Sequence, residues 1–107
     1  MAKDNLQGTL DLLVLQTLAR GEQHGYGITC HILAASDNQL RVEEGSLYPA
    51  LRRMESAGLI QAEWKRSENN RRARYYRLTT TGTKRLAQET KTWQNHTAAV
   101  AAFLKFA

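Results

Sequence analysis

Residues 44–78 read EGSLYPALRRMESAGLIQAEWKRSENNRRARYYRL, and this stretch decides the fold because its hydrophobic period changes within it. Before Gly58 the apolar residues recur every three to four positions, which is the spacing of a helix. From Ile60 onward they alternate with polar residues, which is typical of strands. The stretch therefore predicts a helix over residues 44–57, ended by a glycine, and then a β-hairpin with its tip at residues 67–72.

Two further helices are expected before this stretch. The first covers residues 9–20, where apolar residues fall at helical spacing and Leu12 and Leu15 add a second apolar side. A short helix that is apolar on two sides is usually buried on both, so these two leucines are expected to face a partner subunit. The second helix is expected at residues 26–35, and the alternating residues 39–42 permit one short strand.

The last part of the chain is expected to be a single helix that follows Thr79, a good N-cap residue. Its apolar side repeats in alternating steps of four and three residues, which is the heptad rhythm of a helix that pairs with another helix. Two of the six positions on that side are threonine, so the pairing needs support from the rest of the domain. The six positions are Leu86, Thr90, Trp93, Thr97, Val100 and Leu104.

The order of these elements predicts the fold class. Three helices followed by a hairpin and a last helix is mainly α with a small β-hairpin (α+β), as in a winged helix-turn-helix with a C-terminal dimerisation helix. We expect residues 1–78 to form a DNA-binding domain and residues 79–107 a dimerisation helix, joined in one compact unit. No apolar run reaches the roughly 18 residues of a membrane span, and a single cysteine fits a reducing compartment, so a cytoplasmic protein is expected.

Positive charge gathers in the hairpin. The chain of 107 residues has a formal net charge of +5, and residues 60–78 hold six Lys or Arg against two Glu. One interpretation is an element that binds a polyanion such as DNA. The other is a solvated basic face that only aids solubility. Arg71, Arg72 and Arg74 lie at or beside the hairpin tip, where they could enter a minor groove or contact phosphates.

The helix over residues 44–57 has the pattern of a recognition helix. Leu47, Leu51 and Met54 share one face and are expected in the core. The opposite face carries small, polar and arginine side chains, which fit a major groove, although ordinary amphipathic helices also carry serine and arginine. The exposed face holds Ser46, Pro49, Arg52, Arg53 and Ser56, with Tyr48 at its edge.

These residues resemble the PadR family of bacterial transcriptional regulators over nearly the whole chain. The matching stretches are 6–15 (LQGTLDLLVL), 18–28 with HGYG at 24–27, 44–60 (EGSLYPALRRMESAGLI) and 75–82 (YYRLTTTG). The single C-terminal helix resembles the small members of the family, of the kind abundant in acidobacteria. The resemblance implies a homodimer whose C-terminal helices embrace the partner subunit, and a palindromic operator of double-stranded DNA.

The resemblance also implies particular DNA contacts. Tyr26 is expected to contact a phosphate, and the alternative is that it packs against Ile60 and the hairpin. Many relatives carry a Gly-Gly-Arg-Pro type of hairpin tip where this chain reads NNRRA at residues 69–73, so which hairpin arginine reaches DNA stays open. The implied contacts are Tyr26, Ser46, Tyr48, Pro49, Arg53, Arg71, Arg72 and Arg74.

Trp93 has two interpretations. In multidrug-responsive relatives, tryptophans at this point of the last helix line a pore between subunits and stack on flat aromatic ligands, so by resemblance Trp93 is a candidate effector site. The favoured alternative is that Trp93 packs in the dimer contact, because tryptophan is mostly buried in proteins.

Other kinds of site have little support in the sequence. Cys30, His24, His31 and His96 lack the paired spacing of metal ligands, so neither a metal nor a cofactor is expected. Cys30 is expected to be a small buried residue, with a thiol sensor as the alternative. No grouping of nucleophile and base is present, so an enzyme is not expected. The remaining alternative is a winged-helix module for protein contacts or non-specific nucleic-acid binding, without a ligand response.

Overall fold

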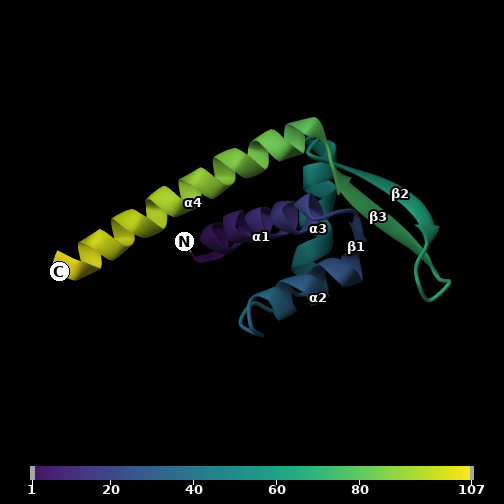
Figure 1. The fold of residues 1–107 in the computed structure, drawn as a ribbon, viewed down its shortest axis with the longest axis horizontal. Helices are drawn as coiled ribbons and strands as arrows, with labels where there is room; N and C mark the ends of the chain where they lie inside the picture. The colour runs from purple at the N-terminus through teal and green to yellow at the C-terminus, as the bar shows by residue number, and fades with distance from the viewer. Residues whose placement is uncertain (1, 107) are drawn as a thin grey trace.

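The computed structural model describes residues 2–106, with side chains from residue 9 onward. In this range the helices and a small sheet follow the expected order along the chain (Figure 1). The helices are α1 (Ala2–Ala19), α2 (Gly25–Ala35), α3 (Glu44–Ser56) and α4 (Thr80–Phe106). The strands are β1 (Gln23–His24), β2 (Ile60–Arg66) and β3 (Arg72–Leu78). The α+β order of three helices, a hairpin and a last helix is therefore confirmed.

The structure corrects three details of the predicted elements. Helix α1 begins at Ala2, several residues before the expected start. Residues 39–42 form no strand, because a strand needs a neighbour to pair with and this loop between α2 and α3 has none beside it. The turn expected before α2 contains the short strand β1, which pairs antiparallel with β3 and gives the sheet the order β1-β3-β2.

The core lies where α1, α2 and α3 meet the sheet. The face of α3 that the sequence assigns to the core is buried, with Leu47, Leu51 and Met54 almost fully covered. Such tightly packed interiors are sensitive to the loss of even one methylene. The core residues are Leu10, Val14, Leu15, Leu18, Ile28, Ile32, Leu47, Ala50, Leu51, Met54, Leu59, Ile60, Tyr76 and Leu86.

Helix α3 ends as the sequence predicts. Gly58 has a φ of +77°, which a residue without a Cβ adopts at little cost. The Gly58 amide donates to the carbonyl of Glu55, and the Leu59 amide donates to the carbonyl of Met54, each at 3.0 Å. This is a Schellman ending, and Leu59 is buried in the same core cluster as Met54, as the hydrophobic contact of this motif requires. The turn aims the chain from α3 directly into β2.

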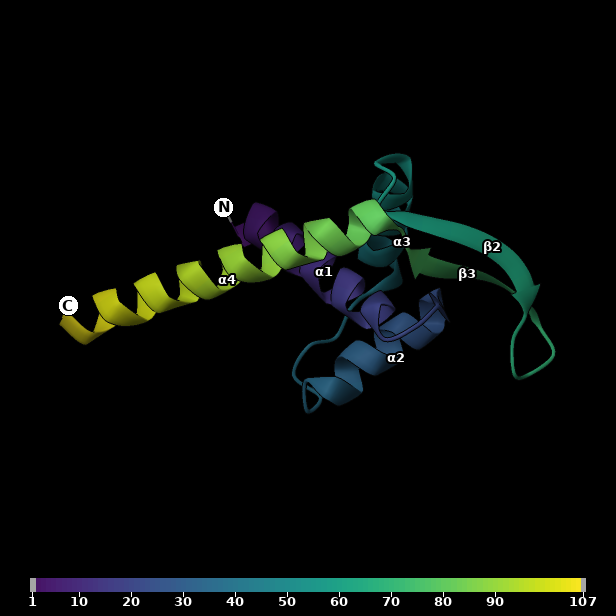
Figure 2. The ribbon, with the colours of Figure 1, turned by 45° about the horizontal axis from the view of Figure 1, so that its top comes forward.

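The hairpin has a continuous register from Ile60 opposite Leu78 to Arg66 opposite Arg72. At its tip the Ser67 amide donates to the Arg71 carbonyl at 2.7 Å, and Asn70 has a φ of +58°. Asparagine tolerates this left-handed conformation better than most residues, as the sequence indicated. The hairpin therefore projects from the molecule as a regular two-stranded arm (Figure 2).

Thr79 joins the sheet to α4 and confirms its predicted role as N-cap. Its hydroxyl oxygen accepts from the Gly82 amide at 3.0 Å and donates to the carbonyl of Gly58 at 2.6 Å. The Thr79 amide donates to the carbonyl of Leu59 at 3.1 Å. A Cβ on Gly82 would lie only 2.0 Å from that same carbonyl oxygen, so only glycine fits there. The start of α4 is thus fixed against the end of α3.

The outer part of α4 extends away from the other elements, past the N-terminal end of α1 (Figures 1 and 2). Of the residues expected in a dimer contact, Trp93, Val100 and Leu104 are exposed, whereas Leu12 is half-buried. Leu15 and Leu86 are core residues of the chain itself, which corrects their expected place on a face turned to a partner. Among the described helices, none combines the length and the apolar composition that crossing a membrane needs.

Cys30 is exposed, which corrects the expectation that it is buried. Helix α2 packs through Ile28 and Ile32, and a residue two positions from each lies about 200° around a helix, on the outer side. His24 does not gather with other metal-ligand side chains, and the described residues contain no group of three or more such side chains. Its Nδ1 accepts from the Gly27 amide at 3.0 Å and so caps α2.

Candidate nucleic-acid interface

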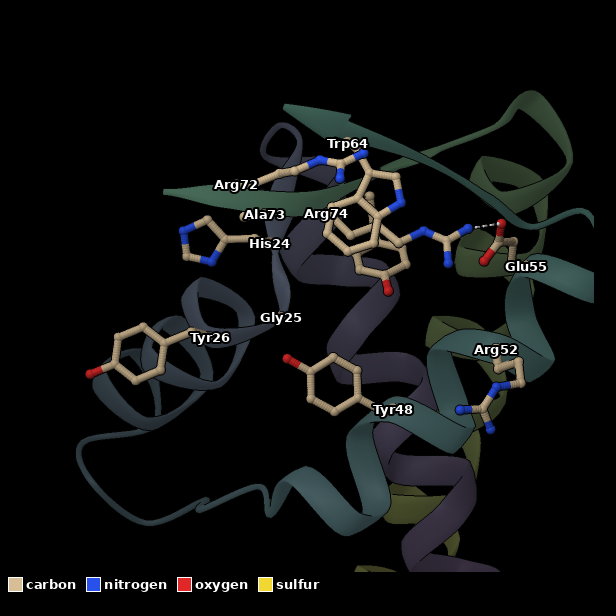
Figure 3. A pocket seen from close by; sticks show the side chains of 11 residues that line it. His24, Gly25, Tyr26, Tyr48, Arg52, Glu55, Trp64, Arg72, Ala73 and Arg74 are labelled. Carbon is tan, nitrogen blue, oxygen red and sulfur yellow. Dashed lines mark hydrogen bonds and ion pairs between the residues drawn. The ribbon is translucent and has the colours of Figure 1, made fainter. Parts of the chain in front are cut away.

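A groove of about 470 Å³ separates α3 from the hairpin (Figure 3). Tyr48 and Arg52 of α3 border one side, and Trp64, Arg72 and Arg74 of the hairpin border the other. Aromatic rings interleaved with arginines are typical of surfaces that bind nucleic acids, since the guanidinium groups attract phosphates and the rings offer flat faces. The two elements that the sequence assigned to DNA therefore share one concave surface.

The outer face of α3 is open to solvent as predicted, with Ser46, Tyr48, Pro49 and Arg52 all exposed. Tyr48 lies beside the N-terminal end of α2 (Figure 3), where a Cβ on Gly25 would come within 2.5 Å of its hydroxyl oxygen. The glycine therefore leaves the space that the Tyr48 ring occupies at the edge of the groove.

Arg52 extends from α3 and is one of the residues that line the groove (Figure 3). Among the described residues Arg52 has no hydrogen bond or ion pair, so its five N–H donors are available to a ligand. An arginine in this state can approach the O6 and N7 acceptors of guanine in a bidentate way.

Arg53 has a different environment, which the sequence did not reveal. Its two terminal nitrogens donate to the two carboxylate oxygens of Asp11 on α1, at 2.7 and 3.1 Å. This hydrogen bonding raises the pKa of Arg53 further above its usual value. Arg53 does not line the groove, so the structure separates it from Arg52 although the two are adjacent in sequence.

The hairpin arginines also differ in whether a carboxylate pairs with them. The Arg74 guanidinium forms an ion pair with Glu55 of α3 at 2.8 Å and lies 6.0 Å from the centre of the Tyr76 ring. Arg72 has no carboxylate partner in the described structure and stacks over the Trp64 ring at 4.8 Å. Arg71 is exposed at the tip. The positive charge that no described carboxylate offsets therefore increases toward the tip.

Trp64 is a functional candidate that the sequence analysis missed. Its side chain is 54% exposed, which is unusual for tryptophan, and it faces the groove (Figure 3). The available signal was its position directly across the hairpin from Arg74 in a strongly basic segment. Alternation places Trp64 on one face of the strand with Ile60 and Ala62, but periodicity does not distinguish a buried face from a face that binds a ligand.

An ion pair and a cation–π contact hold the outer part of the hairpin, where Lys65 pairs with Ala73 across the strands. Lys65 pairs with Glu22 in the loop before β1 and lies 4.8 Å from the centre of the Tyr75 ring. Tyr76 is buried beneath the groove, and this burial raises its pKa, so its phenol is neutral at neutral pH. A buried, uncharged Tyr76 therefore lies beneath the groove, while Arg52, Arg72 and Arg74 border it.

Tyr26 lies at the mouth of the groove and is 71% exposed (Figure 3). It does not pack in the core beside Ile60, which was the alternative to a phosphate contact. Hydrogen bonding with Cys30 raises the pKa of Tyr26, so the phenol keeps its proton at neutral pH. A neutral hydroxyl in this position is a suitable donor to a phosphate oxygen.

Comparisons with known proteins agree on one family. The model of the transcriptional regulator PadR-like family matches residues 14–88. Transcriptional regulator Rv3488 of Mycobacterium tuberculosis is 35% identical over 97 residues, which cover 81% of this chain and 87% of the relative. A transcriptional regulator structure from Clostridium thermocellum has a TM-score of 0.84 at 29% identity and covers 96% and 97% of the two chains. A PadR family regulator from Eggerthella lenta has a TM-score of 0.79 at 31% identity, covering 100% and 91%.

Proposed function

Because this chain belongs to the PadR-like family of transcriptional regulators, we propose that it is a repressor that binds a palindromic operator as a homodimer. Regulators of this family bind DNA and typically dimerise. The proposal makes the chain a regulator in the cytoplasm rather than an enzyme, with double-stranded DNA as its partner and no cofactor.

The groove between α3 and the hairpin is the observation that carries the proposal. The outer face of α3 presents Ser46, Tyr48, Pro49 and Arg52 to solvent, and the hairpin tip presents Arg71 and Arg72 beside it. A helix of this kind enters a major groove, where base edges are distinguishable, and a basic hairpin reaches the neighbouring minor groove or the phosphates. Arg74 and Tyr26 would contact the backbone at the edges of this surface.

Dimerisation is proposed through the outer part of α4. Trp93, Val100 and Leu104 repeat at heptad spacing and are exposed along a helix of 27 residues. Pairing with a second copy would remove these apolar side chains from water. The two α3 helices would then enter successive major grooves about 34 Å apart, which requires a two-fold symmetric operator.

Trp93 also supports a narrower proposal about ligand response. Its side chain is 45% exposed on the proposed dimer face, so a planar aromatic compound could stack on it between subunits. Such a ligand would release DNA by changing the angle between the subunits. Quenching of the Trp93 fluorescence by a panel of planar aromatics would support this effector, and an unchanged signal across the panel would leave Trp93 as a dimer contact only.

The proposal is tested by fluorescence polarisation of the full chain with the DNA upstream of its own gene, with scrambled DNA as competitor. If the dimer neutralises about 6–10 phosphates, raising salt from about 50 to 200 mM should weaken binding by about 10³–10⁵-fold. Binding that survives a scrambled competitor supports a sequence-specific repressor. If the upstream DNA shows no preference, sites selected from a randomised library test the same point, and no preference there would contradict the proposal.

A further inference from the structure

The ion pair between Arg53 and Asp11 joins two elements that are far apart in sequence. Asp11 lies in the middle of α1, and Arg53 lies in the last turn of α3. Both terminal nitrogens of the arginine meet both oxygens of the carboxylate, in the parallel geometry that is the strongest arrangement for this pair. The Asp11 side chain is only 23% exposed, so water screens the pair less than an open surface pair.

This geometry conflicts with direct base reading by Arg53. Bidentate reading of guanine needs two parallel N–H donors directed at O6 and N7. In Arg53 the two terminal nitrogens are already directed at Asp11. Turning the guanidinium to DNA would leave a partly buried carboxylate without this partner beside the phosphates, and a charge that loses its partner is costly. Arg52, one residue earlier, has no such partner among the described residues and lines the groove.

The position of α1 gives the pair a consequence for DNA binding. Helix α1 packs against α2, α3, α4 and β3, so the orientation of α3 on α1 also affects its orientation relative to these elements. The closely packed apolar side of α3 sets its distance from α1 and the face that it turns to the core, although hydrophobic burial itself is non-directional. A bidentate pair adds a directional contact at the end of α3.

We propose that Arg53 is a positioning residue that fixes the rotation of α3 on α1 through Asp11, and that Arg52 is the arginine of α3 that contacts a base. This inference rests on the proposed function, because it assigns roles within the same DNA-binding surface. It replaces the expectation from the family resemblance that Arg53 itself contacts DNA.

The experiment is a double-mutant cycle with the full chain. Asp11→Ala, Arg53→Ala and the double variant are compared with the wild type for affinity to the operator and to scrambled DNA. The ratio of the two affinities is the readout, because removing one charge changes general attraction to both DNAs alike. Arg53→Lys is the conservative variant, and Arg52→Ala is the matched control on the adjacent residue.

If Arg53 positions α3, each single variant lowers the affinity ratio by about fivefold, and the double variant also by about fivefold rather than by the product. The loss spreads over all contacted base pairs of the half-site, and Arg53→Lys retains more of the ratio because it keeps the charge. Arg52→Ala instead loses about 5- to 150-fold, concentrated at one base pair.

Three results would overturn the inference. Asp11→Ala with an unchanged ratio, together with a loss at one base pair in Arg53→Ala, would make Arg53 a base reader. A lower melting temperature with an unchanged ratio would reduce the pair to a stabilising contact. Purely multiplicative losses would show that the two residues act independently. A wild type without sequence preference would instead contradict the proposed function, and the inference would fall with it.

Discussion

Two regions of the molecule differ in how they bury their apolar side chains. One is the head, which is formed by α1, α2, α3 and the sheet. The other is the outer part of α4, residues 87–106. The head has a continuous core to which α1, α2, α3, β2 and β3 contribute. Residues 87–106 contain no buried side chain in the described structure, although Phe103 and Leu104 are large and apolar. One region satisfies its apolar residues within the chain, whereas the other presents them to water.

This difference shows that one sequence can specify its two regions in different ways. The head is specified by packing among its own elements, and packing is sensitive to single side chains. The outer part of α4 gains helical order from its sequence but gains burial only from another surface. Mutations in the two regions should therefore differ in kind, because the head responds through stability and α4 through assembly.

The largest effect is expected in the head. Leu51→Ala removes a nearly fully buried side chain from the centre of α3 and should lower the free energy of unfolding by about 2–5 kcal/mol. Urea denaturation measures this loss, which should be similar at low and high protein concentration. A loss below about 1 kcal/mol would mean that the site collapses around the smaller residue, and the contrast between the regions would weaken.

The next effect is expected in α4. The double variant Trp93→Ala with Leu104→Ala should leave the head folded but lower operator affinity by on the order of 10²-fold, because a monomer holds a single half-site. Sedimentation should show the shift to monomer, and circular dichroism should show an intact head. Asn95→Ala is the control, since Asn95 lies about 200° around the helix from Trp93 and should not affect assembly. A variant that stays dimeric would place the dimer contact elsewhere.

A smaller effect is expected at the boundary between the two regions. Thr79→Ala removes the N-cap of α4 and the hydroxyl contact with Gly58, and it should cost about 1 kcal/mol of stability. Thr79→Ser keeps the hydroxyl and serves as the control in thermal unfolding. Equal melting temperatures for the alanine and serine variants would show that the hydroxyl does not hold α4 to the head.

The smallest effect is expected within the head but outside its core. Cys30 is exposed on the outer side of α2, so Cys30→Ser should change the free energy of unfolding by less than about 0.5 kcal/mol. Thermal unfolding and operator titration of the two proteins measure this. A clear loss of stability would mean that the exposure of a side chain does not by itself predict which residues of the head can be substituted without loss of stability.

The sequence predicted best the structural features that depend on residues close together in the chain. The change of period after Gly58 predicts the helix end and the hairpin, and both are confirmed because local spacing determines them. Thr79 is confirmed as an N-cap for the same reason. A short strand is different, because it exists only through its partner: β1 forms beside β3, while residues 39–42 have no such neighbour.

The candidate site could be predicted only in part. The exposed face of α3 follows from its helical period, so the exposure of Ser46, Tyr48 and Arg52 was foreseeable. The pairing of Arg53 with Asp11 was not, because 42 residues separate them and no local pattern brings them together. Trp64 was missed because alternation indicates a shared face of a strand but not what that face contacts. Its contact with DNA, like that of the arginines, stays a prediction.

The contact between Gly82 and Leu59 has a consequence for the spacing of the half-sites in the proposed operator. Leu59 directly follows the turn that ends α3, and Gly82 presses the first turn of α4 against its carbonyl, where a Cβ would lie 2.0 Å away. The angle between α3 and α4 is therefore set at a backbone contact without an adjustable side chain. In a dimer, this angle and its symmetric copy would determine how far apart the two α3 helices stand. The number of base pairs between half-sites would then depend on the glycine at residue 82, although this residue lies outside the proposed DNA-binding surface.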